Sequence, residues 1–202
     1  QEMKISKENL NKLGFPILSK FGNCWIAGGS IASIILDEKI ENVDIFFPNE
    51  ESRKQAVKKF VNMGAEKINS YPLGDKFKFD DKIYDLLHAG RTPEETITSF
   101  DWTACCAVID KKGNFLCHEN FLEDICAKKL NFINNHAGSY QLSFKNKTKR
   151  LMKYLEKGYQ IDSKILKYWL SKIISDQNKL RNKKKIQIIK FNIIKSKIDL
   201  NK

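Results

Sequence analysis

The chain has 202 residues, enough for one domain of ordinary size, alone or with a small appendage, and for a real hydrophobic core. Apolar residues make up 42% and charged residues 30%, and there are only four prolines, so this composition argues against wholesale disorder and excludes a proline-rich chain. The formal net charge is +12, and its whole excess lies in residues 141–202, which hold eighteen basic and four acidic residues.

This charge asymmetry predicts a polyanionic partner for the C-terminal part, most simply RNA or another nucleic acid. A solvated, lysine-rich helical face is the alternative interpretation. The N-terminal residues are charged and show no secretory signal, and no apolar run is long enough to span a membrane. The five cysteines are odd in number and lack a C-x-x-C motif, which favours reduced thiols and a cytoplasmic location.

The first third of the chain alternates helix and strand patterns. Glycine or proline ends several of these elements: Gly14 follows the first helix, Pro48 follows the second strand, and Gly64 follows the third helix. In chain order we predict a helix at 6–13, a strand at 23–27, a helix at 30–37, a strand at 43–47 and a helix at 50–63.

The middle of the chain continues the mixed pattern. Thr92 and Glu95 have the spacing of a capping box, with proline between them at the first helical position, so a helix is expected to start there. The other elements that we predict are paired strands at 76–79 and 82–87, a strand at 103–109, its hairpin partner at 115–117, a helix at 121–127 and a last strand at 129–132.

After residue 137 the apolar residues recur at spacings of three and four, which indicates helices throughout. We therefore divide the chain into a mixed α+β domain at 1–137 and a small, basic, all-helical domain at 138–202.

One group of residues carries chemistry. Gly28, Gly29 and Ser30 stand at a strand-to-helix turn, where backbone N–H groups and the helix N-terminus can hold a triphosphate. Asn42 and Asp44 share one face of the following strand because side chains two residues apart point the same way, and Asp85 on a later strand could join them. Convergent carboxylates bind divalent metal ions, and two Mg²⁺ ions could activate an attacking hydroxyl and neutralise a leaving pyrophosphate.

This series resembles the nucleotidyltransferase superfamily of tRNA nucleotidyltransferases and bacterial poly(A) polymerases. The segment WIAGGSIASIILDEKIENVDIFF resembles the glycine turn and the D-x-D motif of their head domain, and IYDLL resembles the later carboxylate. SFDWTACCAVI is similar to the RDFTINAL segment, FLEDICAKKL to a later segment, and RLMKYLEKGY to the start of the helical neck. The similarity covers about residues 24–159, and a short, phage-type member would account for the Lys-, Ile- and Asn-rich composition.

The resemblance implies a nucleotidyltransferase-like, mixed five-stranded sheet with helices on one side, followed by the helical domain. It implies an NTP such as ATP and two Mg²⁺ ions as ligands, and transfer of a nucleotide to the 3′ end of a tRNA-like RNA or to another hydroxyl. The residues that it assigns to the nucleotide are Gly28, Gly29, Ser30, Asp101, Thr103, Arg150, Lys153 and, more weakly, Arg91, and those that it assigns to metal are Asp44, Asp85 and Asn42.

The sequence also departs from the family pattern. Asn42 replaces the first carboxylate of D-x-D, so one metal position loses a negative charge, and Phe100 replaces the arginine before Asp101. No E-D-x-x-R element appears in the neck. Two interpretations therefore stay open: a metal-dependent nucleotidyltransferase, or a catalytically degenerate relative that binds nucleotide or nucleic acid, or has a structural role.

Overall fold

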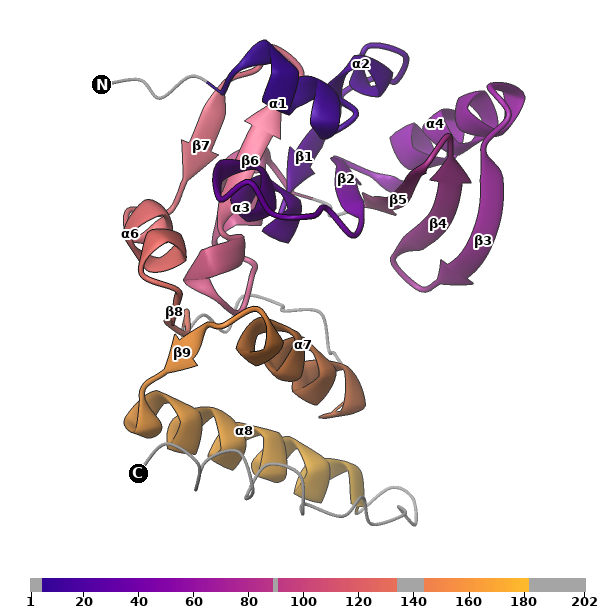
Figure 1. Ribbon diagram of the computed structural model, residues 1–202. Helices are drawn as coiled ribbons and strands as arrows, with labels where there is room; N and C mark the ends of the chain where they lie inside the picture. Colours follow the sequence, from indigo (N-terminus) through magenta and orange to yellow (C-terminus); the bar gives the residue numbers. More distant parts are fainter. Residues whose placement is uncertain (1–4, 89–90, 134–143, 182–202) are drawn as a thin grey trace. The chain divides into compact units, whose positions relative to one another are not determined.

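A computed structural model describes residues 5–88, 91–133 and 144–181 (Figure 1). The chain divides into two compact units, Gln1–Ile165 and Leu166–Lys202. The domain boundary that we expect near residue 137 lies outside the described residues. The second unit contains the greater part of helix α8 (Ser163–Arg181), and the first contains all the other described elements.

A mixed sheet forms the body of the first unit, as the α+β prediction requires. Its described strands follow the order β3-β4-β5-β2-β1-β6-β7, in which β2 and β5 are parallel and every other neighbouring pair is antiparallel. Within the described residues this sheet has seven strands, two more than the five that we expected. Their bounds are Trp25–Ala27 (β1), Val43–Phe47 (β2), Glu66–Tyr71 (β3), Gly74–Phe79 (β4), Lys82–His88 (β5), Ala107–Asp110 (β6) and Phe115–Cys117 (β7).

The described helices of the first unit are short except for two of thirteen residues, α4 and α7. The capping box predicted at Thr92 and Glu95 is confirmed and begins α5. A small two-stranded sheet joins β8 (Lys129–Leu130) to β9 (Gln160–Ile161). The helices are α1 (Lys7–Lys12), α2 (Phe15–Leu18), α3 (Gly29–Ile35), α4 (Glu50–Asn62), α5 (Pro93–Ile97), the 3-10 turn η1 (Thr103–Cys105), α6 (Phe121–Cys126) and α7 (Phe144–Glu156).

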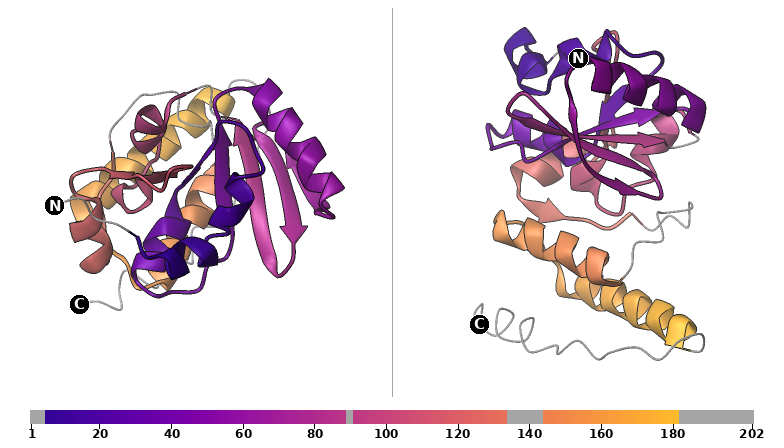
Figure 2. Two further views of the ribbon diagram at one scale, coloured as in Figure 1. Left: turned by 90° about the horizontal axis from the view of Figure 1, so that it is seen from above. Right: turned by 90° about the vertical axis from the view of Figure 1, so that its right-hand side faces the viewer.

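Helix α4 covers one face of the sheet (Figure 2). Its Phe60 is fully buried, and the Phe60 ring packs against those of Phe77 on β4 and Tyr84 on β5 at centroid distances of 5.5 Å. Asp85 follows Tyr84 on the same strand, so its side chain points to the opposite face.

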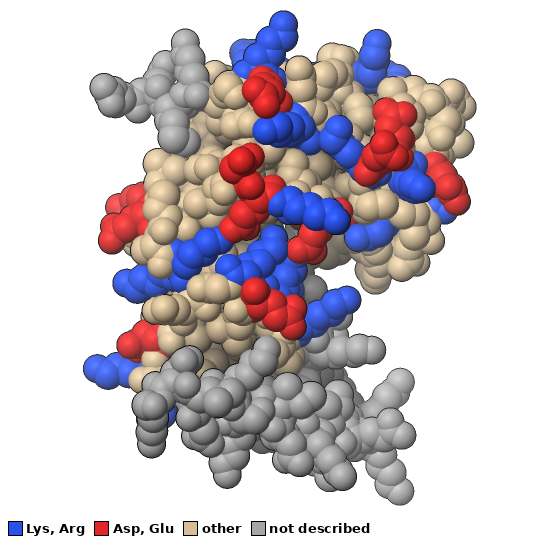
Figure 3. Space-filling view, in the orientation of Figure 1, with Lys and Arg blue, Asp and Glu red and all other residues tan. Residues whose placement is uncertain are grey.

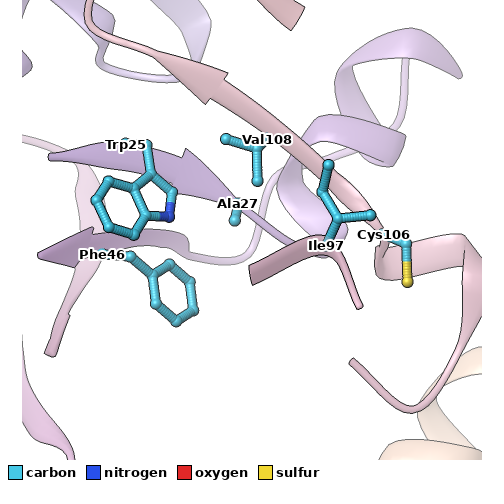
Figure 4. Close-up of a cluster of buried hydrophobic side chains, with 6 residues drawn as sticks. All are labelled: Trp25, Ala27, Phe46, Ile97, Cys106 and Val108. Carbon is cyan, nitrogen blue, oxygen red and sulfur yellow. The ribbon is translucent and has the colours of Figure 1, made fainter. Parts of the chain in front are cut away.

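The opposite face carries a second apolar cluster (Figure 4). Ile97 of α5 lies in this cluster, so helices cover both faces of the sheet, and the expectation of helices on one side is wrong. The indole nitrogen of Trp25 donates to the hydroxyl of Thr96 at 3.1 Å, which fixes α5 on β1. The buried members are Trp25, Ala27, Phe46, Ile97, Cys106 and Val108.

Ionic contacts fasten α4 to strands β3 and β4. Arg53 donates to Glu50 and to Asp75, and the Asp75 carboxylate also receives Lys67 at 2.6 Å and the hydroxyl of Ser70 at 2.7 Å. Burial alone raises the pKa of Asp75, but the hydrogen bonds from Lys67, Ser70 and Arg53 outweigh it and lower the pKa to about 2.

Asp75→Asn is expected to lower the free energy of unfolding at pH 7 by about 2 kcal/mol. The folded-state pKa lies below the unfolded one, so this stabilisation is complete above the unfolded pKa of about 4 and disappears as the pH falls through about 2. Urea unfolding of both proteins from pH 7 to pH 2 measures the difference. The control is Asp80→Asn at an exposed position with φ of 50°, which asparagine also tolerates. A loss of stability independent of pH would contradict the ionic explanation.

No described helix is both long enough and apolar enough to cross a membrane.

Candidate functional site

The turn between β1 and α3 needs glycine. Gly28 has φ of 95° and ψ of −158°, a conformation that side chains strongly disfavour. A Cβ atom at Gly28 would lie 3.3 Å from Oδ2 of Asp44 and 3.7 Å from the ring of Phe100. The glycine thus lets the turn approach the carboxylate of Asp44 closely.

Asp44 and Asp85 lie side by side. Strands β2 and β5 are parallel, and in their register Asp44 is the partner of Asp85, so both carboxylates project from the same face of the sheet. Asn42, directly before β2, joins them: its amide nitrogen donates to Oδ1 of Asp44 at 2.7 Å and to Oδ2 of Asp85 at 2.8 Å.

The surroundings of the two carboxylates differ. Burial and then the negative charge of Asp85 raise the pKa of Asp44 well above its ordinary value. Asp85 receives two further donors, the hydroxyl of Tyr71 and the ammonium of Lys76, whose Nζ lies 3.1 Å from Oδ2. The side chain of Asp85 is only 6% exposed.

A cavity of about 190 Å³ opens beside this pair. The glycine turn, Ser30, Asn42 and Asp44 form one wall, and the other includes α7 with Arg150 and Lys153. The hydroxyl of Ser30 is buried and has no hydrogen-bond partner within the part of the chain that the structure describes, so the cavity contains a polar group that could bind a ligand.

Three cations that line the cavity, Arg150 and Lys153 on α7 and Lys157 just after it, are held by acidic partners. Arg150 donates to Oδ1 of Asp101 at 2.7 Å, and the Nζ of Lys153 lies 2.8 Å from Glu41, which also receives Lys157 at 3.4 Å. Figure 3 accordingly shows basic and acidic side chains interleaved across the middle of the molecular surface that it displays. Basic groups are present at the cavity, but each of these three is already partly neutralised.

Four residues assigned by the resemblance stand outside the cavity lining, and one of them, Asp85, reaches it only through its contacts with Asp44 and Asn42. Asp101 acts on the cavity through Arg150. Thr103 is buried and donates to Asp124, which also receives the amide of Asn131 at 2.8 Å, so this threonine stabilises the packing of α6. Arg91 precedes α5 and is not among the residues that line the cavity in the described part of the chain.

Sequence reasoning missed Lys76 and Tyr71 at the site. The alternation of Lys76, Phe77, Lys78 and Phe79 contained a signal, because it places both lysines on the face opposite the buried phenylalanines. Tyr71 lies on β3, a strand that we did not predict, and nothing in the sequence linked it to Asp85.

The donor set fits a divalent ion poorly at one of its two expected positions. Asn42 offers N–H groups to both carboxylates where the family pattern has an acid. Among the described residues, no three His, Cys, Asp or Glu side chains are grouped so that they could hold a metal ion. Asp44 lines the cavity, and its Oδ2 lies next to the glycine turn and is not the oxygen that accepts from Asn42, so this oxygen fits one ion.

Residues 2–128 match the protein family described as Gabija anti-defense 2. The chain belongs to this family. None of the curated proteins matches it.

Solved structures share the fold. The Thermotoga maritima CCA-adding enzyme complexed with tRNA has a TM-score of 0.61 at 14% identity, over 86% of this chain and 43% of that one. A tRNA-processing enzyme in an apo form has 0.58 at 15%, over 83% and 47%. The Bacillus stearothermophilus CCA-adding enzyme in complex with CTP has 0.56 at 17%, over 78% and 42%. This member of the Gabija anti-defense 2 family thus has a nucleotidyltransferase-like fold and spans less than half the length of those proteins.

Proposed function

We propose that this protein counteracts the Gabija defence as a nucleotidyltransferase, transferring a nucleotide from an NTP to a hydroxyl at an RNA 3′ end or on another acceptor. The observation that carries the proposal is a cavity whose lining combines the glycine turn, the carboxylate of Asp44 and the hydroxyl of Ser30, which has no hydrogen-bond partner among the described residues. These three features match the needs of a phosphate chain and of a reacting hydroxyl beside it.

The cavity suits the phosphate part of the nucleotide. At about 190 Å³ it is smaller than the roughly 300 Å³ of the smallest usual ligand pockets, so the sugar and base would extend outward. Gly28, Gly29 and Ser30 would hold the phosphates, and Arg150 and Lys153 would exchange part of their contact with Asp101 and Glu41 for the phosphate oxygens.

The transfer itself makes one bond and breaks one. The acceptor oxygen bonds to the α-phosphorus, the bond from that phosphorus to the β-bridging oxygen breaks, pyrophosphate leaves, and the hydroxyl proton passes to water. Asp44 orients the attacking hydroxyl from beside the glycine turn. Mg²⁺, when bound at Asp44, supplies positive charge that offsets the charge developing on the phosphates.

The acceptor would be RNA in the cytoplasm. Residues 141–202 hold eighteen basic and four acidic residues, the charge that a polyanion requires. The five cysteines are free thiols, which suits a reducing compartment. CTP and tRNA accompany two of the solved structures of similar fold, and both are proposed here as the chemical class of ligand.

The contacts of Asn42 favour a second candidate function. Its amide donates hydrogen bonds to both carboxylates at the position where the family pattern has a metal-binding acid. This is expected of a protein that binds nucleotide or nucleic acid without turnover. Such a protein would act against the defence by occupying a ligand rather than by modifying it.

Incubation of the protein with each labelled NTP, Mg²⁺ or Mn²⁺ and total RNA separates the two candidates. We expect label to enter RNA with the unmodified protein. Label that appears only with Asn42→Asp would establish the second candidate, and absence of both binding and transfer would overturn both. In cells that carry the Gabija defence, expression of the active protein should restore plating of a phage that this defence blocks.

Asn42→Asp also has an expected cost in stability. The substitution removes two hydrogen bonds and adds a third carboxylate beside Asp44 and Asp85, so the metal-free protein should lose about 2–3 kcal/mol of unfolding free energy. Thermal unfolding in EDTA and in Mn²⁺ at a concentration of roughly a hundred times the Kd measures this loss. Mn²⁺ should restore most of it. A variant equally stable in EDTA would show that the amide bridge contributes little.

A further inference from the structure

Four strands place one row of side chains across the sheet beside the glycine turn. In the registers of the sheet, Lys76 on β4 is the partner of Asp85 on β5, Asp85 is the partner of Asp44 on β2, and Asp44 is the partner of Ala27 at the end of β1. Cross-strand partners share a face and lie in contact. A lysine is therefore built into the same row as the two carboxylates.

The Asp85 carboxylate is engaged by the protein's own donors. Oδ2 accepts from the amide of Asn42 at 2.8 Å and lies 3.1 Å from Nζ of Lys76, and Oδ1 accepts from the hydroxyl of Tyr71. An ionised carboxylate has about four lone-pair positions, and three of them are used here. A metal ion could bind Asp85 only by displacing at least one of these donors.

The ion pair of Lys76 and Asp85 differs from an ordinary surface salt bridge. Exposed pairs contribute little because water screens both charges. Here the side chain of Asp85 is 6% exposed and that of Lys76 is 34% exposed. The ammonium therefore approaches from the solvent side, while the carboxylate is shielded from water. Removing the cation would leave a buried carboxylate short of positive charge.

Asp44 is the acceptor that remains. Its Oδ1 accepts from Asn42, whereas Oδ2 is the atom that the glycine turn approaches, and Asp44 is one of the residues that line the cavity. One divalent ion could bind there together with phosphate oxygens of the nucleotide.

We propose that this site holds one divalent cation rather than two, and that Lys76 takes the place of the second. Lys76 is a positioning residue: it acts through Asp85 and, by way of the Asn42 amide, fixes the carboxylate of Asp44. The inference deepens the proposed function and rests on it, but it concerns how many cations bind, which can be measured without turnover.

The test is Mn²⁺ binding, followed by the EPR signal of free Mn²⁺, with and without the non-reactive nucleotide α,β-methylene-ATP. With the nucleotide, the unmodified protein is expected to bind one Mn²⁺ per chain. The double variant Asn42→Asp with Lys76→Met should bind two, because it restores a carboxylate and frees Asp85. Lys76→Arg should keep the count at one.

Lys78→Met is the matched control. Lys78 lies two residues along β4 on the same face, it is exposed, and no ion pair involving it occurs among the described residues. Without nucleotide, Lys76→Met is expected to bind Mn²⁺ about tenfold more tightly than Lys78→Met, a difference of about 1.4 kcal/mol in binding free energy. The reason is that the negative charge of the carboxylate pair is no longer offset by the ammonium of Lys76.

The outcomes separate cleanly. Two Mn²⁺ ions on the unmodified protein, or equal Mn²⁺ affinities of Lys76→Met and Lys78→Met, would overturn the inference. Failure of the nucleotide to bind would count against the proposed function, and the measurements without nucleotide would still decide the role of Lys76. If Lys76→Met does not fold, Lys76→Gln keeps an N–H donor for Asp85 while it removes the charge, and the same direction of change is expected.

Discussion

Asp44→Asn is expected to reduce nucleotide transfer by at least about 10³-fold, because it removes the negative charge of a carboxylate that lines the cavity and whose Oδ2 lies next to the glycine turn. Asparagine has nearly the same shape, and its carbonyl oxygen can still accept from the amide of Asn42. The loss would therefore report on charge and ligand chemistry rather than on packing. Label incorporation at saturating NTP measures it.

The same substitution is expected to stabilise the metal-free protein. Burial and Asp85 raise the pKa of Asp44, so its ionised form is unfavourable in the folded state. A carboxyl group with a raised folded-state pKa costs nothing below its unfolded pKa of about 4 and costs progressively more as the pH rises toward the folded value. In EDTA at pH 7.5, Asp44→Asn should thus gain about 1–2 kcal/mol of unfolding free energy, and near pH 4 the gain should vanish.

Asp81→Asn, at an exposed carboxylate, is the control for both measurements and should change neither. Transfer that survives in Asp44→Asn would contradict the proposed role of this residue. A gain of stability that is the same at pH 4 and pH 7.5 would contradict the electrostatic explanation and point to a change in packing.

Local patterns predicted which residues lie together at the glycine turn. The glycine pair follows a buried strand, and two acids follow on strands whose apolar residues are unmistakable, so chain order and the period of two placed Gly28, Asp44 and Asp85 on neighbouring elements. The structure brings these three together through the parallel pairing of β2 with β5 and the antiparallel pairing of β1 with β2.

The edges of the sheet were harder to predict. Strand β3 is exposed at nearly every position and has the sequence EKINSY, so it shows no apolar alternation and owes its conformation to hydrogen bonds with β4. The strand predicted at 103–109 begins as the 3-10 turn η1, in which the hydroxyl of Thr103 is engaged with Asp124. The missed strand β3 and the wrong start of the strand at 103–109 both depend on contacts between residues distant in sequence, which a local pattern does not contain.

The contacts of Asn42 and Lys76 at the site also join residues that are distant in sequence. A sequence shows that Asn42 is not an acid, but it does not show that its amide would bridge Asp44 and Asp85. The partnership of Lys76 with Asp85 depends on the register of the β4–β5 hairpin, which a shift of one residue would reverse. The metal stoichiometry that we propose therefore depends on the fold and could not be derived from the motif.

Phe60→Ala is expected to be the most destabilising substitution that we predict, with a loss of about 3–5 kcal/mol of unfolding free energy. The Phe60 ring is fully buried and packs against four others, at centroid distances of 5.1 Å to Phe79, 5.5 Å to Phe77 and to Tyr84, and 5.6 Å to Phe21. Truncation to alanine would remove the aromatic contacts and leave a cavity between α4 and the sheet.

The effect should extend to the site on the other face of the sheet. Tyr84 and Phe77 are the neighbours of Asp85 and Lys76 along β5 and β4, so a loosened α4 would weaken the strand pair that aligns the cation with the carboxylate. Urea unfolding gives the stability, and Val61→Ala, at an adjacent side chain that is 49% exposed, is the control with an expected change within about 0.5 kcal/mol. A loss below about 1 kcal/mol for Phe60→Ala would mean that the neighbouring rings close over the cavity, and hence that α4 is not the element that holds the β4–β5 pair in register.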